Sequence, residues 1–120
     1  MNESETRKTN YAAIDIGSNA VRLLIKEIEE KQGETHFSKV LMLRVPLRLG
    51  FDVFNIGKIS EKKEKNMIRL MKSFRYLMKI YDVKHCRACA TSAMRDAKNG
   101  LEIIKQIEKK TDVHIDIIDG

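Results

Sequence analysis

Two short polar segments carry residue types that could bind a phosphate group. The first runs from Asp15 to Asn19 and places a carboxylate before the turn-forming residues Gly17, Ser18 and Asn19. Because glycine has no Cβ, backbone N–H groups near Gly17 can approach an anion, and the Ser18 hydroxyl and Asn19 amide can add donors. Asp15 would repel a bare phosphate, so we expect it to hold a divalent cation, Mg²⁺ or another, through water. Taken alone, these residues favour a simpler interpretation, an ordinary hairpin whose turn Asp15 caps.

The second segment contains Thr91, Ser92 and Arg95. Hydroxyls and free backbone N–H groups at the start of a helical turn suit an anion, and the Arg95 guanidinium can hold two phosphate oxygens at once. Simpler interpretations are open here too. Either hydroxyl could cap a helix, and Arg95 could form a surface ion pair with Asp96 or another carboxylate nearby.

Apolar runs separated by turn residues predict the strands that position these segments. Each polar segment directly follows a predicted strand. Five strands are expected, at Tyr11–Ile16, Val21–Ile28, Phe37–Val45, Val83–Ala90 and Val113–Ile118.

Apolar residues at spacings of three and four predict two helices. The longer covers Glu61 to Tyr81, with Ser60 as its N-cap. The shorter is marked by Leu101, Ile103, Ile104 and Ile107.

The stretch from Pro46 to Ser60 contains Gly50, Asn55 and Gly57 and is expected to be an irregular loop. The predicted order of elements is therefore βββαβαβ. This order predicts an α/β protein with a mixed five-stranded sheet, in which the later strands run parallel through helical crossovers.

Composition limits the class of protein. With 120 residues, 42% of them hydrophobic, the chain can bury one modest core, so we expect a polar tail over residues 1–10 and one domain over residues 11–120. The absence of a long apolar run or a secretory signal, and the presence of only two cysteines, predict a cytoplasmic protein without membrane contact. The net charge of +6 favours a polyanionic partner without choosing among nucleic acid, phosphorylated metabolites and acidic proteins.

Together, the two segments resemble the N-terminal region of the exopolyphosphatase and guanosine pentaphosphate phosphohydrolase family, in the sugar kinase, heat-shock protein and actin superfamily. The order and spacing of the matching segments agree along nearly all of the chain after the tail. They are Ala12–Asn19 with Val21–Ile25, Arg48–Gly50, Ala90–Asn99 and Ile115–Gly120.

The resemblance implies a ribonuclease H-like (actin-like ATPase) fold and a hydrolase that releases terminal phosphate from polyphosphate or guanosine pentaphosphate. It implies a first phosphate loop at Gly17, Ser18 and Asn19. Asp15 would lie near a Mg²⁺ or other divalent cation, and Thr91, Ser92 and Arg95 would contact substrate phosphate. Arg95 would also contact the transition state. An intact protein of this kind could be a homodimer.

Two departures from the family pattern matter. Phe51 follows the Arg48–Gly50 stretch where members often carry an acidic residue, so the role of that loop is open. The family's catalytic glutamate, which activates the attacking water, is expected beyond Gly120, as is a second phosphate loop. In-line attack on a phosphoryl group needs these parts, so we expect the 120-residue chain alone to be inactive.

Two other functions stay open. One is a sensor module that binds polyphosphate or the guanosine alarmone without hydrolysing it. The other is nucleic-acid binding by the basic side of the long helix, which is not expected because Phe74 and Tyr81 belong to the apolar stripe.

The cysteines and histidines are not expected to form a site. Cys86 and Cys89 are three residues apart on a strand and should face opposite sides of the sheet, as buried structural residues. The three histidines show no close ligand spacing, so zinc is not expected.

Overall fold

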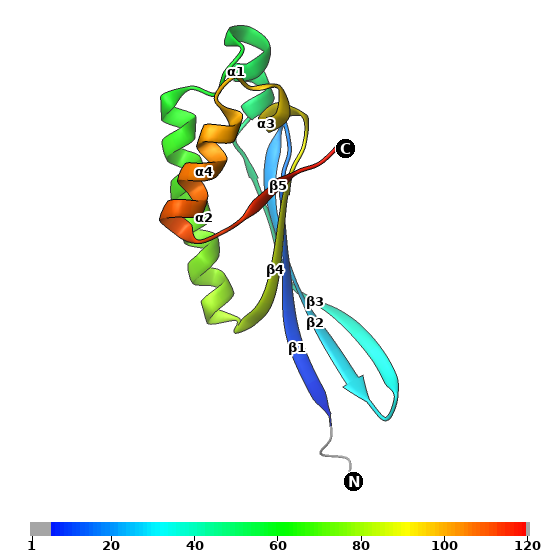
Figure 1. Ribbon diagram of the computed structural model, residues 1–120. Coiled ribbons are helices and arrows are strands. Elements are labelled where there is room, and N and C mark those ends of the chain that lie inside the picture. Colours follow the sequence, from blue (N-terminus) through cyan, green and yellow to red (C-terminus); the bar gives the residue numbers. More distant parts are fainter. Residues whose placement is uncertain (1–5, 120) are drawn as a thin grey trace.

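The structure is a computed structural model that describes residues 6–119. It is elongated, with extents of 60 × 25 × 19 Å, and a sheet runs along its length (Figure 1). The strands are β1 (Arg7–Ile16), β2 (Ala20–Lys31), β3 (Glu34–Pro46), β4 (Val83–Ala90) and β5 (Ile115–Ile117). The helices are α1 (Leu49–Ile56), α2 (Glu61–Ile80), α3 (Ser92–Asp96) and α4 (Gly100–Thr111). Among the described residues, no helix is both long and apolar enough to cross a lipid bilayer.

The sheet is mixed, with five strands in the order β3-β2-β1-β4-β5. The β1–β2 and β2–β3 pairs are antiparallel, and the β1–β4 and β4–β5 pairs are parallel. The predicted α/β class and the predicted order of strands and main helices are confirmed. The short helix α1 is an addition to it, and the short helix α3 is the helical turn expected to start at Thr91 and Ser92.

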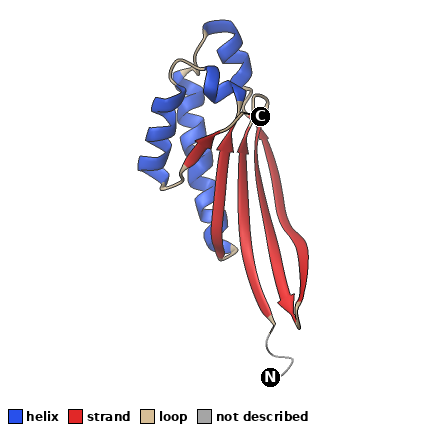
Figure 2. Cartoon of the chain, turned by 45° about the vertical axis from the view of Figure 1, so that its right-hand side comes forward, coloured by secondary structure: helices blue, strands red, loops and turns tan. Residues whose placement is uncertain are grey.

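The helices α2 and α4 cover one face of the sheet (Figure 2). Along β1, Ala12, Ile14 and Ile16 point into the core, whereas Ala13 and Asp15 point to the uncovered face. This alternation follows from the two-residue period of a strand. Buried residues of the helices complete the core, among them Met67, Met71, Phe74, Met78, Ile103 and Ile107.

One end of the sheet extends beyond the helices as an arm made of β1, β2 and β3 (Figure 1). The predicted tail over residues 1–10 is wrong for residues 7–10, because these belong to β1 and pair with β2. The apolar pattern gave no signal here because much of the arm is in contact with water. Opposite charges across the strands pair instead, as between Lys8 and Glu29 at 3.5 Å. Residues 1–5 of the predicted tail lie outside the described residues.

The predicted irregular loop over Pro46–Ser60 is also wrong, because it contains α1. The residues on either side of α1, Arg48 and Gly57, both have left-handed backbone conformations. Gly50 lies inside α1, and glycine is required there because a Cβ at this position would come within 2.8 Å of the Ser18 Cβ. A tertiary contact thus explains a glycine that in the sequence looks like a loop signal.

The other helices and strands follow the sequence closely. Helix α2 begins after Ser60, whose side chain accepts a hydrogen bond from the Lys63 N–H at 3.3 Å, so the predicted N-cap is confirmed. Strand β4 has its predicted bounds. Strand β5 is shorter than predicted, and Leu101 of α4 is 67% exposed rather than part of the core.

Hydrogen bonds to the Asp52 side chain link α1 to the start of α2. Its carboxylate accepts hydrogen bonds from the Lys63 Nζ at 2.7 Å and from the Ser60 N–H at 2.9 Å. Burial alone would raise the pKa of Asp52, but the bonds from Lys63 and Ser60 outweigh burial and hold the pKa below its ordinary value of 3.8. The ionised carboxylate therefore stabilises the fold above that pH, and this contribution is lost as the pH falls through the lowered pKa.

We expect Asp52→Asn to lower the free energy of unfolding at pH 7 by about 2 kcal/mol, since it removes a charged hydrogen bond from a mostly buried group. The difference from the wild type should shrink as the pH falls below about 4. Urea unfolding at several pH values measures both effects. The control is Asp82→Asn, because Asp82 pairs with Lys84 in solvent and should contribute less than about 1 kcal/mol. Equal losses in the two variants would contradict this assignment.

Candidate functional site

The two polar segments predicted to bind phosphate lie side by side. Strands β1 and β4 are adjacent and parallel, so their carboxyl ends meet at the same edge of the sheet. The Ser18 Oγ, after β1, lies 3.0 Å from the Ser92 Oγ, after β4. The Thr91 N–H also donates to the Ile16 carbonyl at 3.2 Å. The two junctions, which are 74 residues apart in the chain, therefore meet at one edge of the sheet.

The backbone donors of the turn after β1 differ in whether an anion could use them. The Gly17 N–H is not free, because it donates to the Ala20 carbonyl at 3.0 Å. The carbonyls of Ser18 and Asn19 accept from the N–H groups of Gly50 and Arg48 at 2.8 and 2.9 Å. Since the C=O and N–H of one trans peptide point in opposite directions, the Asn19 N–H points away from the start of α1. This N–H can serve an anion, whereas the Gly17 N–H cannot.

The Thr91 hydroxyl does not cap α3, because the helix has no side-chain capping bond at its N-cap Thr91. The Ser92 hydroxyl is directed to Ser18. The sequence left open that either hydroxyl caps a helix, and the structure shows no such capping bond from Thr91.

The Arg95 side chain reaches toward the chain after β5. Its Nη1 lies 3.5 Å from the Ile118 carbonyl and 3.5 Å from the Asp119 Oδ1, and its Nε lies 3.5 Å from the Asp96 Oδ1. The simpler interpretation of Arg95, a surface ion pair, thus describes its present contacts. These contacts are long, and the side chain is 40% exposed, so they hold the guanidinium weakly.

The carboxyl ends of three strands meet at this edge. The Ile118 N–H donates to the Ala90 carbonyl at 2.9 Å, which brings the segment after β5 beside the end of β4. We call the group Ser18, Asn19, Thr91, Ser92 and Arg95 the strand-edge site.

Asp15 lies one residue before the end of β1, on the uncovered face of the sheet, with Arg22 and Cys89 as its cross-strand neighbours. Its carboxylate has no hydrogen bond or ion pair within residues 6–119. In that range, no group of three or more His, Cys, Asp or Glu side chains is arranged so that it could hold a metal ion. Asp15 therefore does not belong to a closed metal cage. A single free carboxylate does fit Mg²⁺, which commonly keeps several waters and binds through one or two carboxylates and substrate phosphates.

A pocket of about 770 Å³ adjoins the strand-edge site through Asn19. Its other lining residues are Arg44, Pro46, Arg48, Phe51, Phe54 and Asn55. The sequence did not single out Arg44 or Phe54, because α1 was not recognised. The spacing of Phe51 and Phe54, three residues apart, would have placed both rings on one side of that helix.

Other titratable groups do not join this site. Cys86 pairs with Ala12 and Cys89 with Asp15 in the sheet register, so they face opposite sides as predicted. Their predicted burial is wrong, because Cys86 is exposed and Cys89 is half-buried. Cys86 faces the helices but borders an open pocket beside Arg75, which explains its exposure.

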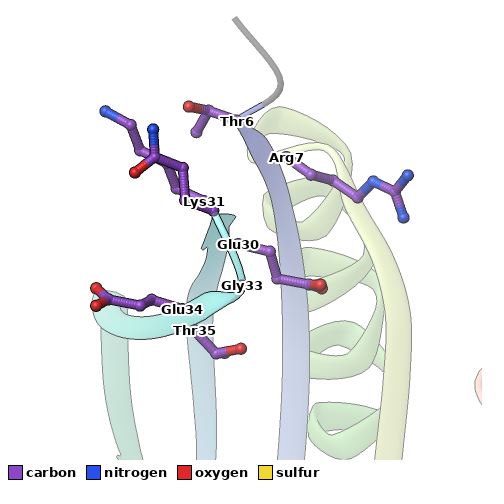
Figure 3. Close-up of a pocket in the computed structure, with 8 residues that line it drawn as sticks. Thr6, Arg7, Glu30, Lys31, Gly33, Glu34 and Thr35 are labelled. Carbon is purple, nitrogen blue, oxygen red and sulfur yellow. The ribbon is translucent and has the colours of Figure 1, made fainter. Parts of the chain in front are cut away.

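A pocket of about 580 Å³ lies at the far end of the arm, lined by the start of β1 at Arg7 and by residues at and beside the β2–β3 turn, from Glu30 to Thr35 (Figure 3). Strand β1 starts at this end and the strand-edge site follows its other end, about 30 Å away at 3.3 Å per residue. This pocket mixes Arg7 and Lys31 with Glu30 and Glu34 and is not part of the candidate site.

Similarity to known proteins covers most of the chain. The sequence profile of the Ppx/GppA phosphatase family matches residues 25–120. A bifunctional 3-dehydroquinate synthase/phosphatase of Fusobacterium nucleatum is 32% identical over 118 residues, which are 94% of this chain and 18% of that protein. Exopolyphosphatase 1 of Mycobacterium bovis is 28% identical over 107 residues, which are 89% of this chain and 30% of that protein.

Solved structures agree with this. The crystal structure of the Aquifex aeolicus member of the Ppx/GppA family matches 94% of this chain with a TM-score of 0.85 at 30% identity. An exopolyphosphatase from Cytophaga hutchinsonii matches 93% with a TM-score of 0.81 at 28% identity. The expected actin-like fold is thereby confirmed. The chain spans 36% and 35% of these two structures. From the profile match and these neighbours, the chain belongs to the Ppx/GppA phosphatase family.

Proposed function

We propose that this chain is the phosphate-binding N-terminal part of an exopolyphosphatase-type phosphohydrolase, which releases terminal phosphate from inorganic polyphosphate. The observation that carries the proposal is the 3.0 Å contact between the Ser18 and Ser92 hydroxyls, which makes one site of two distant segments. The family assignment and the exopolyphosphatases among the relatives support it.

In this proposal the strand-edge site grips the terminal phosphate. When phosphate binds, the Ser18 and Ser92 hydroxyls give up their mutual hydrogen bond, and these hydroxyls, the Thr91 hydroxyl and the Asn19 N–H donate to phosphate oxygens. Arg95 leaves its loose contacts at Asp96 and Asp119 and takes two phosphate oxygens, because a guanidinium matches phosphate geometry.

Asp15 would hold the divalent cation on the uncovered face of the sheet. A bound Mg²⁺ would neutralise phosphate charge as the reaction proceeds. Arg22, the cross-strand neighbour of Asp15, adds positive charge beside it. The attacking water would be activated by the glutamate expected beyond Gly120. In this proposal, residues 6–119 therefore bind the phosphate and the cation but do not activate the water.

The test is phosphate release from polyphosphate by the product of the complete reading frame, with Mg²⁺ and with a chelator. Ser18→Ala and Ser92→Ala should each lower kcat/KM about tenfold, since each removes one hydrogen bond to phosphate. Because the two hydroxyls touch, the double variant should lose less than the product of the single losses. The control is Ser73→Ala, whose hydroxyl donates to the Leu70 carbonyl on α2.

Each alternative function predicts a different result when binding is measured together with phosphate release. Binding of polyphosphate without phosphate release would support a sensor module. A tighter, salt-dependent affinity for DNA or RNA than for polyphosphate would support nucleic-acid binding. Activity unchanged in both serine variants would contradict the strand-edge site.

Guanosine pentaphosphate is a second candidate substrate, and the pocket beside Asn19 favours it. Phe51 and Phe54 are 66% and 89% exposed, and an exposed ring can stack on a nucleobase. Arg44 and Arg48 in the same pocket could contact phosphates. If the alarmone is the substrate, Phe54→Ala should raise its KM several-fold and leave the KM for polyphosphate unchanged. Equal effects on both substrates would count against a base-binding role.

A further inference from the structure

A second basic surface lies on the helix layer, away from the strand-edge site. Helices α2 and α4 pack side by side (Figure 1), and an open groove of about 450 Å³ lies between their C-terminal halves. Five cationic side chains line it, those of Lys72, Arg75, Lys79, Lys109 and Lys110. We call this the α2–α4 groove.

The positive charge of the α2–α4 groove is not neutralised by the protein. None of its five cations forms an ion pair with a carboxylate in residues 6–119, whereas Lys8, Lys63, Lys65 and Lys84 elsewhere do. Asp112 is the single acidic side chain among the residues that line the groove.

Helix geometry explains only some of these charges. Lys79, Lys109 and Lys110 lie in the last turns of their helices, where a cation interacts favourably with the helix dipole. Lys72 and Arg75 lie further from the end of α2, and like charges three or four residues apart on one helix repel each other. Arg75 is also half-buried. A repulsive cluster with a partly buried guanidinium is typical of a surface that binds an anion.

We propose that the α2–α4 groove binds a distal part of a polyphosphate chain and acts as an exosite for long substrates. This inference rests on the proposed function for the choice of polyanion. Single-stranded nucleic acid is less suited, because such sites interleave several stacking aromatics with their cations and Tyr76 is the one aromatic lining residue.

Helix α2 starts at the end of the molecule that carries α1 and α3 and runs away from it (Figure 1), so the groove on its C-terminal half is too far from the strand-edge site to share one short substrate with it. Lys72 lies twelve residues beyond Ser60, or about 18 Å along α2, and Lys79 lies about 28 Å along it. Only a long chain of phosphates can occupy both places. The exosite should therefore raise affinity for long chains through a second point of attachment, without affecting short ones.

The first experiment uses calorimetry to measure how tightly the 120-residue chain binds polyphosphate of about 100 units at several salt concentrations. Such a chain is far longer than the separation of the two sites. The triple variant Lys72→Ala, Lys79→Ala, Lys109→Ala should lose on the order of 100-fold in affinity, and the salt dependence of log K should fall by about 2. The matched control is Lys26→Ala, Lys31→Ala, Lys62→Ala, which removes the same charge from exposed sites outside the groove. Equal losses in the two triple variants would overturn the proposal, because net charge alone would then explain binding.

A second experiment separates the exosite from the proposed hydrolysis. With the product of the complete reading frame, the groove variant should raise KM for long polyphosphate at unchanged kcat, and should leave both constants for tripolyphosphate unchanged. If that product releases no phosphate, the proposed function fails, and the binding result still decides the exosite. If single-stranded DNA of equal charge binds the groove more tightly than polyphosphate, the groove is a nucleic-acid site and the proposal is wrong.

Discussion

In the product of the complete reading frame, replacing Arg95 with alanine is expected to lower kcat/KM for phosphate release by a factor on the order of 10² to 10³, the loss typical of removing one donor to a transition-state oxyanion. Arg95 lies in the short helix α3, three residues after Ser92, whose hydroxyl contacts that of Ser18. Its guanidinium rests 3.5 Å from the carboxylates of Asp96 and Asp119. Such loose contacts cost little to break when a phosphate arrives.

The substitution series distinguishes the charge of Arg95 from its shape. Arg95→Lys keeps the charge but loses the planar fork, so it should recover only part of the activity. Arg69→Ala is the matched control, because Arg69 is an exposed arginine on α2 whose Nη1 donates to the Asn66 side chain at 3.1 Å.

Stability separates a catalytic role from a structural one. The Arg95 ion pairs are partly exposed, so Arg95→Ala should change the free energy of unfolding by less than about 1 kcal/mol. Phosphate release is measured by a colorimetric assay and stability by thermal unfolding of the same samples. An alanine variant that keeps activity within twofold of the wild type would remove Arg95 from the proposed mechanism.

The sequence predicted those parts of the fold that depend on local patterns. The stripe through Met67, Met71, Phe74 and Met78 repeats at helical spacing over about three turns, and α2 has the predicted start at Glu61. The sequence also predicted that the later strands run parallel through helical crossovers, but not that β4 lies beside β1 and parallel to it. This arrangement alone required that Ser18 and Ser92 lie at one edge of the sheet.

Features set by tertiary contact were not predictable. Gly50 and Gly57 resemble loop signals, yet Gly50 belongs to a helix and is required by its approach to Ser18. The arm residues Arg7 to Asn10 carry no apolar alternation, although they pair with β2. The direction of Arg95 depends on Asp119, a partner that no local pattern indicates.

The sequence named the residues of the candidate site but did not show which of their atoms are available to a ligand. The structure brings Ser18, Asn19 and Ser92 together, but Asp15 lies outside this group, on the uncovered face of the sheet. The Gly17 N–H is used by Ala20, so glycine here serves the turn and not the anion directly. A sequence motif names the residues of a phosphate loop but does not reveal which N–H groups stay free.

Gly100→Ala is expected to destabilise the fold by about 3 kcal/mol or more, at the upper end of the cost of overpacking. A Cβ at this position would lie 2.0 Å from the Met94 carbonyl oxygen and 3.0 Å from the Met94 carbonyl carbon. Both are backbone atoms, so no side-chain rotation relieves the clash. Either α3 or α4 has to move.

The turn between these helices is held from the other side as well. The Asn99 side chain exchanges two hydrogen bonds with the Ile59 backbone, at 2.8 and 3.0 Å. The Lys98 N–H donates to the Gly57 carbonyl at 3.0 Å. Since these bonds resist a shift of α4, the strain should pass to α3, which carries Ser92 and Arg95. A change far from the substrate should therefore also disturb the strand-edge site.

Gly33→Ala is the control for Gly100→Ala, because it adds the same methyl group in open space. No atom lies within 4 Å of a Cβ at Gly33, whose φ is +81°. The left-handed backbone alone should cost about 1 to 2 kcal/mol. Thermal unfolding should show a midpoint lower by about 10 °C or more for Gly100→Ala and by about half of that or less for Gly33→Ala. Equal shifts would mean that the backbone around Met94 yields to the added methyl group, and the coupling between α4 and the site would then be wrong.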